Sequence, residues 1–269
     1  MLADWSNKEV LIVVRTYPTP ATKGIEVSCT AGITRDGKWI RLFPVPYRFL
    51  EEDQRFAKYQ WIDVKVRRAR NDQRPESYNL NADTIRILKS VPPGKEWRAR
   101  SDILKPLRRP SLCEIQDFRD EHGAPTLGIF KPGRIKRLRI DPTETPDWGP
   151  REAAILSQSA LDFGGTTPKG RLEKIPWEFR YEFDCDDPAC TGHSMMCTDW
   201  EMGQSYRSWR RTYGDDGWQA KFRARYERDM IERFDTSFFV GTLHQHPANW
   251  IIVGLYYPPK TQTPDLFGC

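Results

Sequence analysis

The sequence predicts an α+β protein. Its N-terminal half is expected to be β-rich, as a small barrel or a curled sheet, and its C-terminal half to combine a metal knuckle, two helices and a β-hairpin. Three observations predict this class: short apolar runs separated by turn residues before residue 90, prolines that make long helices unfavourable in that half, and two stripes of large apolar side chains at helical spacing after residue 198.

The strands of the N-terminal half are predicted from apolar or alternating runs bounded by turn residues. We expect strands at residues 10–16, 25–34, 39–43, 61–66, 84–88, 127–130 and 135–140. Asp36-Gly37 lies between two such runs and is a strong hairpin signal. Ser111 with Glu114 three residues later forms a capping box, which predicts a helix over 112–121.

A linker over residues 141–146, rich in proline and threonine, divides the chain into a basic β-rich domain, 1–145, and an α+β domain, 146–269. In the second domain, aromatic and charged residues alternate before the cysteine cluster as they do in a strand, and large apolar residues then recur every three or four positions. The elements expected there are a strand at 177–183, helices at 199–213 and 219–234, and paired strands at 237–243 and 249–257.

The composition is that of a folded protein, since 38% of the 269 residues are hydrophobic and 12% aromatic. No apolar run approaches the roughly 18 to 20 residues of a membrane span, and Met1–Lys8 lacks the features of a secretory signal. Six cysteines are too few for a disulfide scaffold in a chain of this length. We therefore expect a cytoplasmic protein whose cysteines are thiols or metal ligands.

Positive charge is concentrated in the first half. Residues 1–150 carry 28 basic and 20 acidic side chains, whereas residues 151–269 carry 14 and 17. Arginine forks pair with phosphate, and neighbouring tryptophans stack on unpaired bases, so the basic clusters predict nucleic-acid binding. The predicted contact residues are Lys65, Arg67, Arg68, Arg70, Arg98, Arg100, Arg108, Arg109, Lys136, Arg137 and Arg139. Alternatively, these residues form solvated strand faces, and the protein is an interaction module whose charge serves solubility.

Three thiols and one imidazole lie within thirteen residues, at Cys185, Cys190, His193 and Cys197. This density and the nearby turn residues predict a tetrahedral zinc site. Cys197 is the least secure ligand because it lies at the entry to a predicted helix, and Cys29 is the alternative fourth ligand. An iron–sulfur cluster would use the same sulfurs. With all positions filled by protein ligands, the metal is expected to be structural.

Acid–base groups follow the cysteine cluster and leave an enzyme open as the alternative, either a nuclease or a hydrolase of bases or nucleotides. Glu201 lies beside aromatic residues that could raise a carboxyl pKa, with Asp199 and Arg207 on the same predicted helix. Asp199 alone is explained by the helix dipole. His244 and His246 share one face if they lie on a strand, or they are exposed in a hairpin loop.

The C-terminal residues Asp265, Leu266 and Phe267 resemble the bacterial sliding-clamp binding peptide, although Thr263 stands where glutamine is preferred. The clamp is therefore a possible partner beside nucleic acid.

Several segments together resemble a widespread, uncharacterised prokaryotic family. They are Cys29-Thr-Ala-Gly-Ile33, Trp39-Ile-Arg-Leu-Phe-Pro44, the C-x4-C-x2-H stretch with Asp199-Trp200-Glu201, Phe239-Val-Gly-Thr242 and Ile252-Val-Gly-Leu255. The resemblance covers most of the chain and implies no activity. The sequence thus predicts a metal-stabilised nucleic-acid-binding protein of the bacterial cytosol, with DNA preferred to RNA, in DNA processing, repair or defence.

Overall fold

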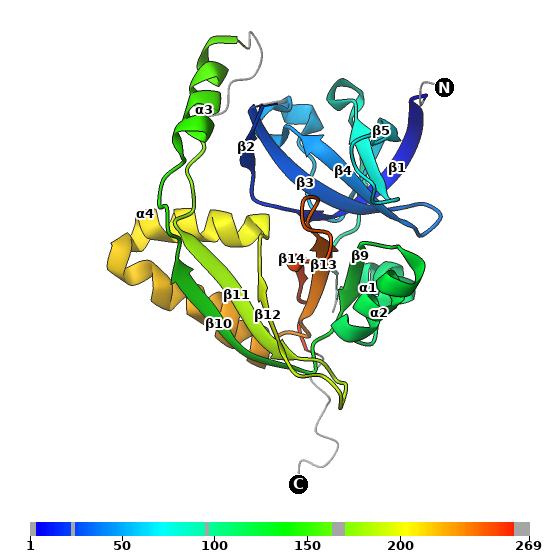
Figure 1. Ribbon diagram of the computed structural model, residues 1–269, viewed down its shortest axis with the longest axis vertical. Helices are drawn as coiled ribbons and strands as arrows, with labels where there is room; N and C mark the ends of the chain where they lie inside the picture. The colour runs from blue at the N-terminus through cyan, green and yellow to red at the C-terminus, as the bar shows by residue number, and fades with distance from the viewer. Residues whose placement is uncertain (1–3, 23–24, 95–96, 163–169, 261–269) are drawn as a thin grey trace.

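A closed β-barrel forms the N-terminal part of the protein, at the upper right of Figure 1. The computed structural model describes residues 4–22, 25–94, 97–162 and 170–260. The barrel strands are β1 (Ser6–Arg15), β3 (Ile25–Thr34), β4 (Trp39–Val45), β6 (Ser77–Leu80) and β5 (Gln60–Arg68). They pair in that order and β5 returns to β1, so the ring is complete; β4 and β6 run parallel and the other pairs antiparallel. The predicted β-rich half is confirmed.

Two short strands extend the barrel sheet, β2 (Thr19–Ala21) beside β3 and β7 (Arg86–Ser90) beside β5. The predicted hairpin at Asp36-Gly37 joins β3 to β4, and Gly37 takes the positive φ of 75° that such a turn requires. Short 3₁₀ turns complete this part of the chain. They are η1 (Tyr47–Phe49), η2 (Glu52–Gln54), η3 (Ala82–Thr84) and η5 (Lys105–Leu107).

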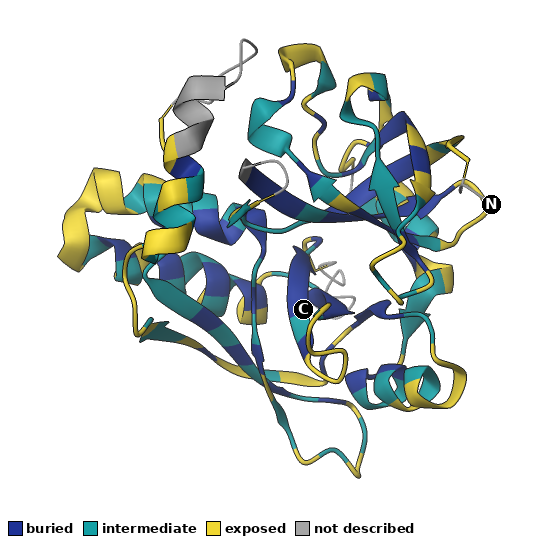
Figure 2. Ribbon diagram, turned by 45° about the horizontal axis from the view of Figure 1, so that its top comes forward, coloured by how far each residue is buried: buried dark blue, intermediate teal, exposed yellow. Residues whose placement is uncertain are grey.

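Residues 10–14 of strand β1 are buried on both faces, which explains their continuous apolar run. Val10 and Ile12 point into the barrel core with Leu42 and Ile62 of neighbouring strands. The alternate residues of β1 belong instead to a second core that reaches the C-terminal part of the chain. Figure 2 shows buried strands in this region, and the second core joins the barrel to the C-terminal part of the chain.

The C-terminal part contains two further sheets. The four-stranded sheet has the order β14 (Trp250–Tyr256), β13 (Ser237–Thr242), β9 (Leu127–Phe130) and β8 (Arg108–Arg109). The three-stranded sheet has the order β10 (Arg134–Pro142), β11 (Trp177–Asp184) and β12 (His193–Met196). The predicted strands at 127–130, 177–183, 237–243 and 249–257 are confirmed, and none of their ends shifts by more than one residue.

The helical segment after the cysteine cluster packs on the three-stranded sheet (Figure 1). It consists of α4 (Trp200–Arg223), the π-helical turn η6 (Ala224–Arg228) and α5 (Asp229–Glu232). Gly214, with φ 73° and ψ −178°, breaks α4 into two helices, as the two separate apolar stripes predict. Most residues of the two stripes are buried, with Tyr206 and Phe222 in one core with Phe179 of β11, whereas Tyr213 at the end of the first stripe is 49% exposed.

Among the described residues, three other α-helices lie outside this segment. They are α1 (Arg98–Leu104), α2 (Leu112–His122) and α3 (Pro150–Asp162). The predicted cap of α2 is confirmed, since the Ser111 hydroxyl accepts the Glu114 N–H at 3.0 Å. The sequence analysis did not predict α3. Strands β10 and β11 pair across the predicted boundary at residue 145, so one sheet spans that position. Among the helices described, none has the length and apolar character needed to cross a membrane.

Candidate metal centre

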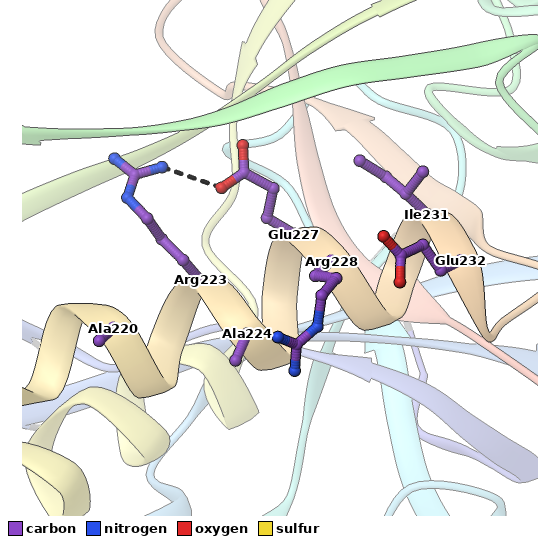
Figure 3. Close-up of a pocket in the computed structure, with 7 residues that line it drawn as sticks. All are labelled: Ala220, Arg223, Ala224, Glu227, Arg228, Ile231 and Glu232. Carbon is purple, nitrogen blue, oxygen red and sulfur yellow. Dashed lines mark hydrogen bonds and ion pairs between the residues drawn. The ribbon is translucent and has the colours of Figure 1, made fainter.

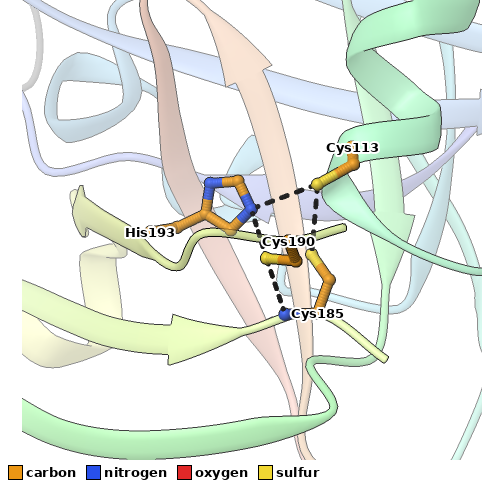
Figure 4. Close-up of side chains that lie close together, drawn as sticks. All are labelled: Cys113, Cys185, Cys190 and His193. Atoms are coloured by element: carbon orange, nitrogen blue, oxygen red, sulfur yellow. Dashed lines mark hydrogen bonds between the residues drawn. The ribbon is translucent and has the colours of Figure 1, made fainter. Parts of the chain in front are cut away.

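Three thiols and one imidazole converge beside the β11–β12 hairpin (Figure 4). They belong to Cys113, Cys185, Cys190 and His193, and their ligand atoms all lie within 4.8 Å of one another. The Nε2 atom of His193 is 3.4 Å from the Sγ of Cys113 and 3.3 Å from that of Cys190. Ligands at about 2.0–2.3 Å from a tetrahedral ion stand about 3.3–3.8 Å apart. This group can therefore hold a metal ion.

Two elements far apart in the sequence bring the four ligands together. Cys113 is the second residue of α2, whereas Cys185 directly follows β11 and His193 begins β12. Cys190 lies in the intervening loop, where the N–H groups of Cys185 and Gly192 donate to its sulfur at 3.3 and 3.4 Å. The loop geometry is thus fixed by the backbone around Cys190.

The turn before β10 braces this ligand loop. Gly133 donates its N–H to the carbonyl oxygen of Asp184 at 2.9 Å. A Cβ at Gly133 would lie 2.7 Å from the backbone nitrogen of Asp186 and 2.9 Å from the carbonyl carbon of Cys185. Only glycine permits this close approach, so Gly133 allows two turns to pack beside the ligands.

The charge balance of the group favours a cation. Burial and the neighbouring thiols of Cys185 and Cys190 raise the pKa of Cys113 to about 12. Burial lowers the pKa of His193, which keeps its imidazole neutral and able to act as a ligand. Thiols that resist ionisation alone become thiolates when a cation shares their site. The N-terminal end of α2 adds a favourable dipole at Cys113.

Cys113 corrects the predicted ligand set. Three predicted ligands, Cys185, Cys190 and His193, do lie together, but neither proposed fourth ligand joins them. Cys197 is 5% exposed in the core, where its N–H donates to the carbonyl oxygen of Phe179. Burial raises the pKa of its thiol. Cys29 lies in the barrel, with its sulfur 3.5 Å from Nη1 of Arg41. Ligand spacing along the chain could not identify Cys113, which is 72 residues from Cys185.

A second polar cluster joins the barrel to α4. The Nζ of Lys58 lies 2.7 Å from Oδ2 of Asp199 and 3.5 Å from Oε2 of Glu201, and the lysine side chain is 8% exposed. Asp199 is the N-cap of α4, because its Oδ1 accepts the N–H groups of Glu201 and Met202. Oδ2 also accepts the N–H of Leu255 at 3.2 Å. Asp199 therefore ties the helix to β14.

Glu201 differs from its predicted state. Burial raises its pKa, but the Lys58 ammonium and the hydrogen bond from Tyr257 at 3.0 Å outweigh burial, and the pKa is lowered. The expectation of a raised pKa is wrong, because the sequence could not show the lysine brought in by the barrel. Glu201 is an ionised, partly exposed carboxylate beside a protonated lysine, whose pKa is raised by its two carboxylate neighbours more than burial lowers it.

Two family models match the chain, one over the barrel and one over the C-terminal part. The model of the family described as Domain of unknown function (DUF8757) matches residues 108–268, and that of Domain of unknown function (DUF8758) matches residues 6–106. The chain belongs to the DUF8757 family. No curated protein matches the sequence. The DUF8757 range contains all four metal-ligand candidates, whereas the DUF8758 range contains the barrel and α1.

The basic clusters differ in how their charges are used. The cluster on β10, in the DUF8757 range, is paired with carboxylates. Its ion pairs are Lys136–Asp184 at 2.7 Å, Arg137–Glu182 at 2.7 Å and Arg139–Asp141 at 2.9 Å. In the second cluster, Arg109 lies 3.5 Å from Glu114, Arg108 and Arg100 stack on tyrosines, and Arg98 is exposed. The cations of the barrel cluster form no ion pair with a described carboxylate. These cations are Lys65, Arg67, Arg68 and Arg70.

The other predicted catalytic residues lie apart from the metal group. His244 and His246 are in the exposed loop between β13 and β14, and Nδ1 of His244 is 3.6 Å from Asp72. Arg207 of α4 pairs with Glu173 at 2.8 Å. Within the described residues, none of these three side chains belongs to a group that could hold a metal ion. The predicted clamp peptide, Asp265, Leu266 and Phe267, lies outside the described residues.

An open hollow of about 400 Å³ runs along residues 220–232 of the helical segment (Figure 3). Arg223 donates to Glu227 at 3.0 Å there, and residues of both signs alternate along one helix face. This is the pattern of a solvated helix face. The metal group of the DUF8757 range is therefore the stronger candidate site.

Proposed function

We propose that this protein binds nucleic acid through the barrel, and that a zinc ion stabilises its DUF8757 part. Zinc fits the donor set best because thiolates and a neutral imidazole in a four-ligand, tetrahedral arrangement are its usual structural ligands. With four protein ligands, no position is left for a catalytic water. Reduced cysteines of this kind suit a cytoplasmic location.

The observation that carries nucleic-acid binding is the combination of cations and aromatic rings on the barrel. Trp5 is 42% exposed, and the guanidinium of Arg67 lies 4.8 Å from its ring centre. Lys8 and Arg68 lie 5.7 and 6.0 Å from the ring centre of Tyr78. Exposed rings stack on unpaired bases, and neighbouring cations pair with phosphates. We therefore expect the ligand to be a single-stranded nucleic acid.

The register of the barrel strands places these groups together. Arg68 pairs with Tyr78 and Arg67 with Asn79 across β5 and β6, while Lys65 lies opposite Asn7 across β5 and β1. Because the barrel cations have no described carboxylate partner, their charge is available to phosphates. The cations of β10, by contrast, are already neutralised by carboxylates of the same sheet.

The test is fluorescence anisotropy with a labelled single strand of about 20 nucleotides, longer than the usual site of one small barrel. The double variant Arg67→Gln/Arg70→Gln should lower the slope of log affinity against log salt by about 0.7 per lost phosphate contact. Arg137→Gln is the matched control, because it removes an arginine that is exposed but paired with Glu182. Absent or salt-independent binding would favour the interaction-module alternative and refute the proposal.

A further inference from the structure

Two strained aromatic residues meet at the junction of the barrel with the DUF8757 part. Tyr59 and Trp97 have φ values of 62° and 54°, and they are the two residues other than glycine with positive φ in the described ranges. Their ring centres are 5.8 Å apart. Backbone strain of this kind persists only where the surrounding structure enforces it, and it clusters at binding and active sites.

Arg100 of α1 supplies a cation between these rings. Its guanidinium carbon lies 4.0 Å from the ring centre of Tyr59 and 4.7 Å from that of Trp97. The Nε group donates to the carbonyl oxygen of Val91 at 2.8 Å, which fixes the orientation of the fork. Arg100 forms no ion pair with any described carboxylate. Its two terminal nitrogens are therefore available to an anion.

Two further polar atoms near Arg100, the hydroxyl of Tyr59 and Oε1 of Glu201, accept no hydrogen bond from the described residues. Tyr59 is 4% exposed, and its buried hydroxyl has no hydrogen-bond partner among the described residues. Glu201 uses Oε2 for Tyr257 and Lys58, while its Oε1 accepts no hydrogen bond from the described chain, and its side chain is 41% exposed. Buried polar groups are normally hydrogen-bonded, so a bound molecule can supply the partner that this hydroxyl lacks.

We propose that Arg100, Tyr59, Trp97 and Glu201 form a binding site for a phosphate monoester on a nucleoside. Arg100 pairs with the phosphate, Glu201 accepts a hydrogen bond from a sugar hydroxyl, and Trp97, half-buried, offers a ring for the base. The phosphate monoester belongs either to a free mononucleotide or to the phosphorylated end of a strand. Tyr59 and Arg67 flank opposite ends of β5, so this site is separate from the barrel cations.

The site is built from both matched ranges. Tyr59, Trp97 and Arg100 come from residues 6–106, whereas Glu201 comes from residues 108–268. Lys58, held by Asp199 and Glu201, fixes the distance between the two parts. Residues 6–106 therefore supply the anion-binding group of α1 but not the acceptor for a sugar hydroxyl.

Calorimetric titration of the full chain with adenosine monophosphate tests the site, with adenosine and inorganic phosphate as separate arms. Arg100→Gln should weaken binding of the monophosphate by about tenfold or more, because a charge-assisted contact is lost. Arg98→Gln, an exposed arginine of the same helix, should leave it unchanged. Titration with a 5′-phosphorylated oligonucleotide and its unphosphorylated form identifies which source of the monoester is bound.

Tyr59→Phe keeps the test independent of folding. It removes only the unpartnered hydroxyl, so the thermal midpoint of the free protein should stay or rise while the affinity for adenosine monophosphate falls. Glu201→Gln should lower the affinity for adenosine monophosphate and leave the affinity for inorganic phosphate unchanged. The proposal is overturned by no binding of either monoester at millimolar concentration, by equal affinity for inorganic phosphate, or by equal effects of the Arg100 and Arg98 variants.

Discussion

Replacing Cys113 with serine tests the metal centre at the ligand that sequence spacing did not reveal. The change removes one of three thiols that, with one imidazole, converge within 4.8 Å of one another. Loss of a residue that only hydrogen-bonds to a metal ligand weakens metal affinity by about 10- to 100-fold. Loss of a ligand itself should therefore weaken the affinity by at least about 100-fold. By linkage, each 100-fold costs about 2.7 kcal/mol of unfolding free energy under saturating zinc.

The assays are zinc content by elemental analysis and urea unfolding with and without chelator. Wild type should carry one equivalent of zinc and lose stability with chelator, whereas Cys113→Ser should carry less and respond little. The control is Cys197→Ala, which removes a core sulfur and costs about 1 kcal/mol but leaves the zinc content at one. Full zinc content in Cys113→Ser, or its loss in Cys197→Ala, would refute the assignment of the fourth ligand.

Three further changes test the junction and the helices. Lys58→Met leaves the buried Asp199 carboxylate unpaired and should cost about 3–5 kcal/mol in urea unfolding, whereas a loss below about 1 kcal/mol would contradict the ion pair. Because the folded-state pKa of Glu201 is lowered, its stabilising contribution is present above the ordinary value of 4.5 and is lost as the pH falls through the folded pKa. Stability against pH should therefore fall less steeply below 4.5 in Glu201→Gln, and identical acid limbs would argue against the lowered pKa. Gly214→Ala forces a side chain into φ 73° and should cost about 1–3 kcal/mol, measured by thermal unfolding, with no loss expected if the helices were continuous.

Local patterns predicted the elements that depend on neighbours in sequence. The capping box at Ser111, the hairpin at Asp36-Gly37 and the two apolar helix stripes all occur as expected. These signals rest on backbone geometry and periodic burial, which the chain encodes within a few residues. The closure of the barrel does not follow from such local signals, because it requires β5 to return to β1 and β6 to run parallel to β4.

The candidate site was predicted in part for the same reason. Cys185, Cys190 and His193 are close in sequence and a hairpin suffices to bring them together, whereas Cys113 joins them only through the packing of α2. The basic side chains show the opposite problem, because the sequence does not reveal which of them are paired with carboxylates. Arg137 looks like a free cation in the sequence, and only the strand register reveals its pairing with Glu182.

The metal centre and the junction are connected by a short, continuous stretch of chain, and this leads to a coupling. Strand β12 begins at the ligand His193 and ends at Met196. The chain continues through Cys197, whose N–H donates to the carbonyl oxygen of Phe179, and Thr198, whose N–H donates to that of Ile252. The next residue is Asp199, the cap that holds Lys58. Removing zinc frees the start of this stretch, so the position of Glu201 should become less fixed. Chelator should therefore weaken adenosine monophosphate binding in wild type, and Cys113→Ser should reproduce that loss without chelator. Equal affinity with and without zinc would show that the two sites are independent.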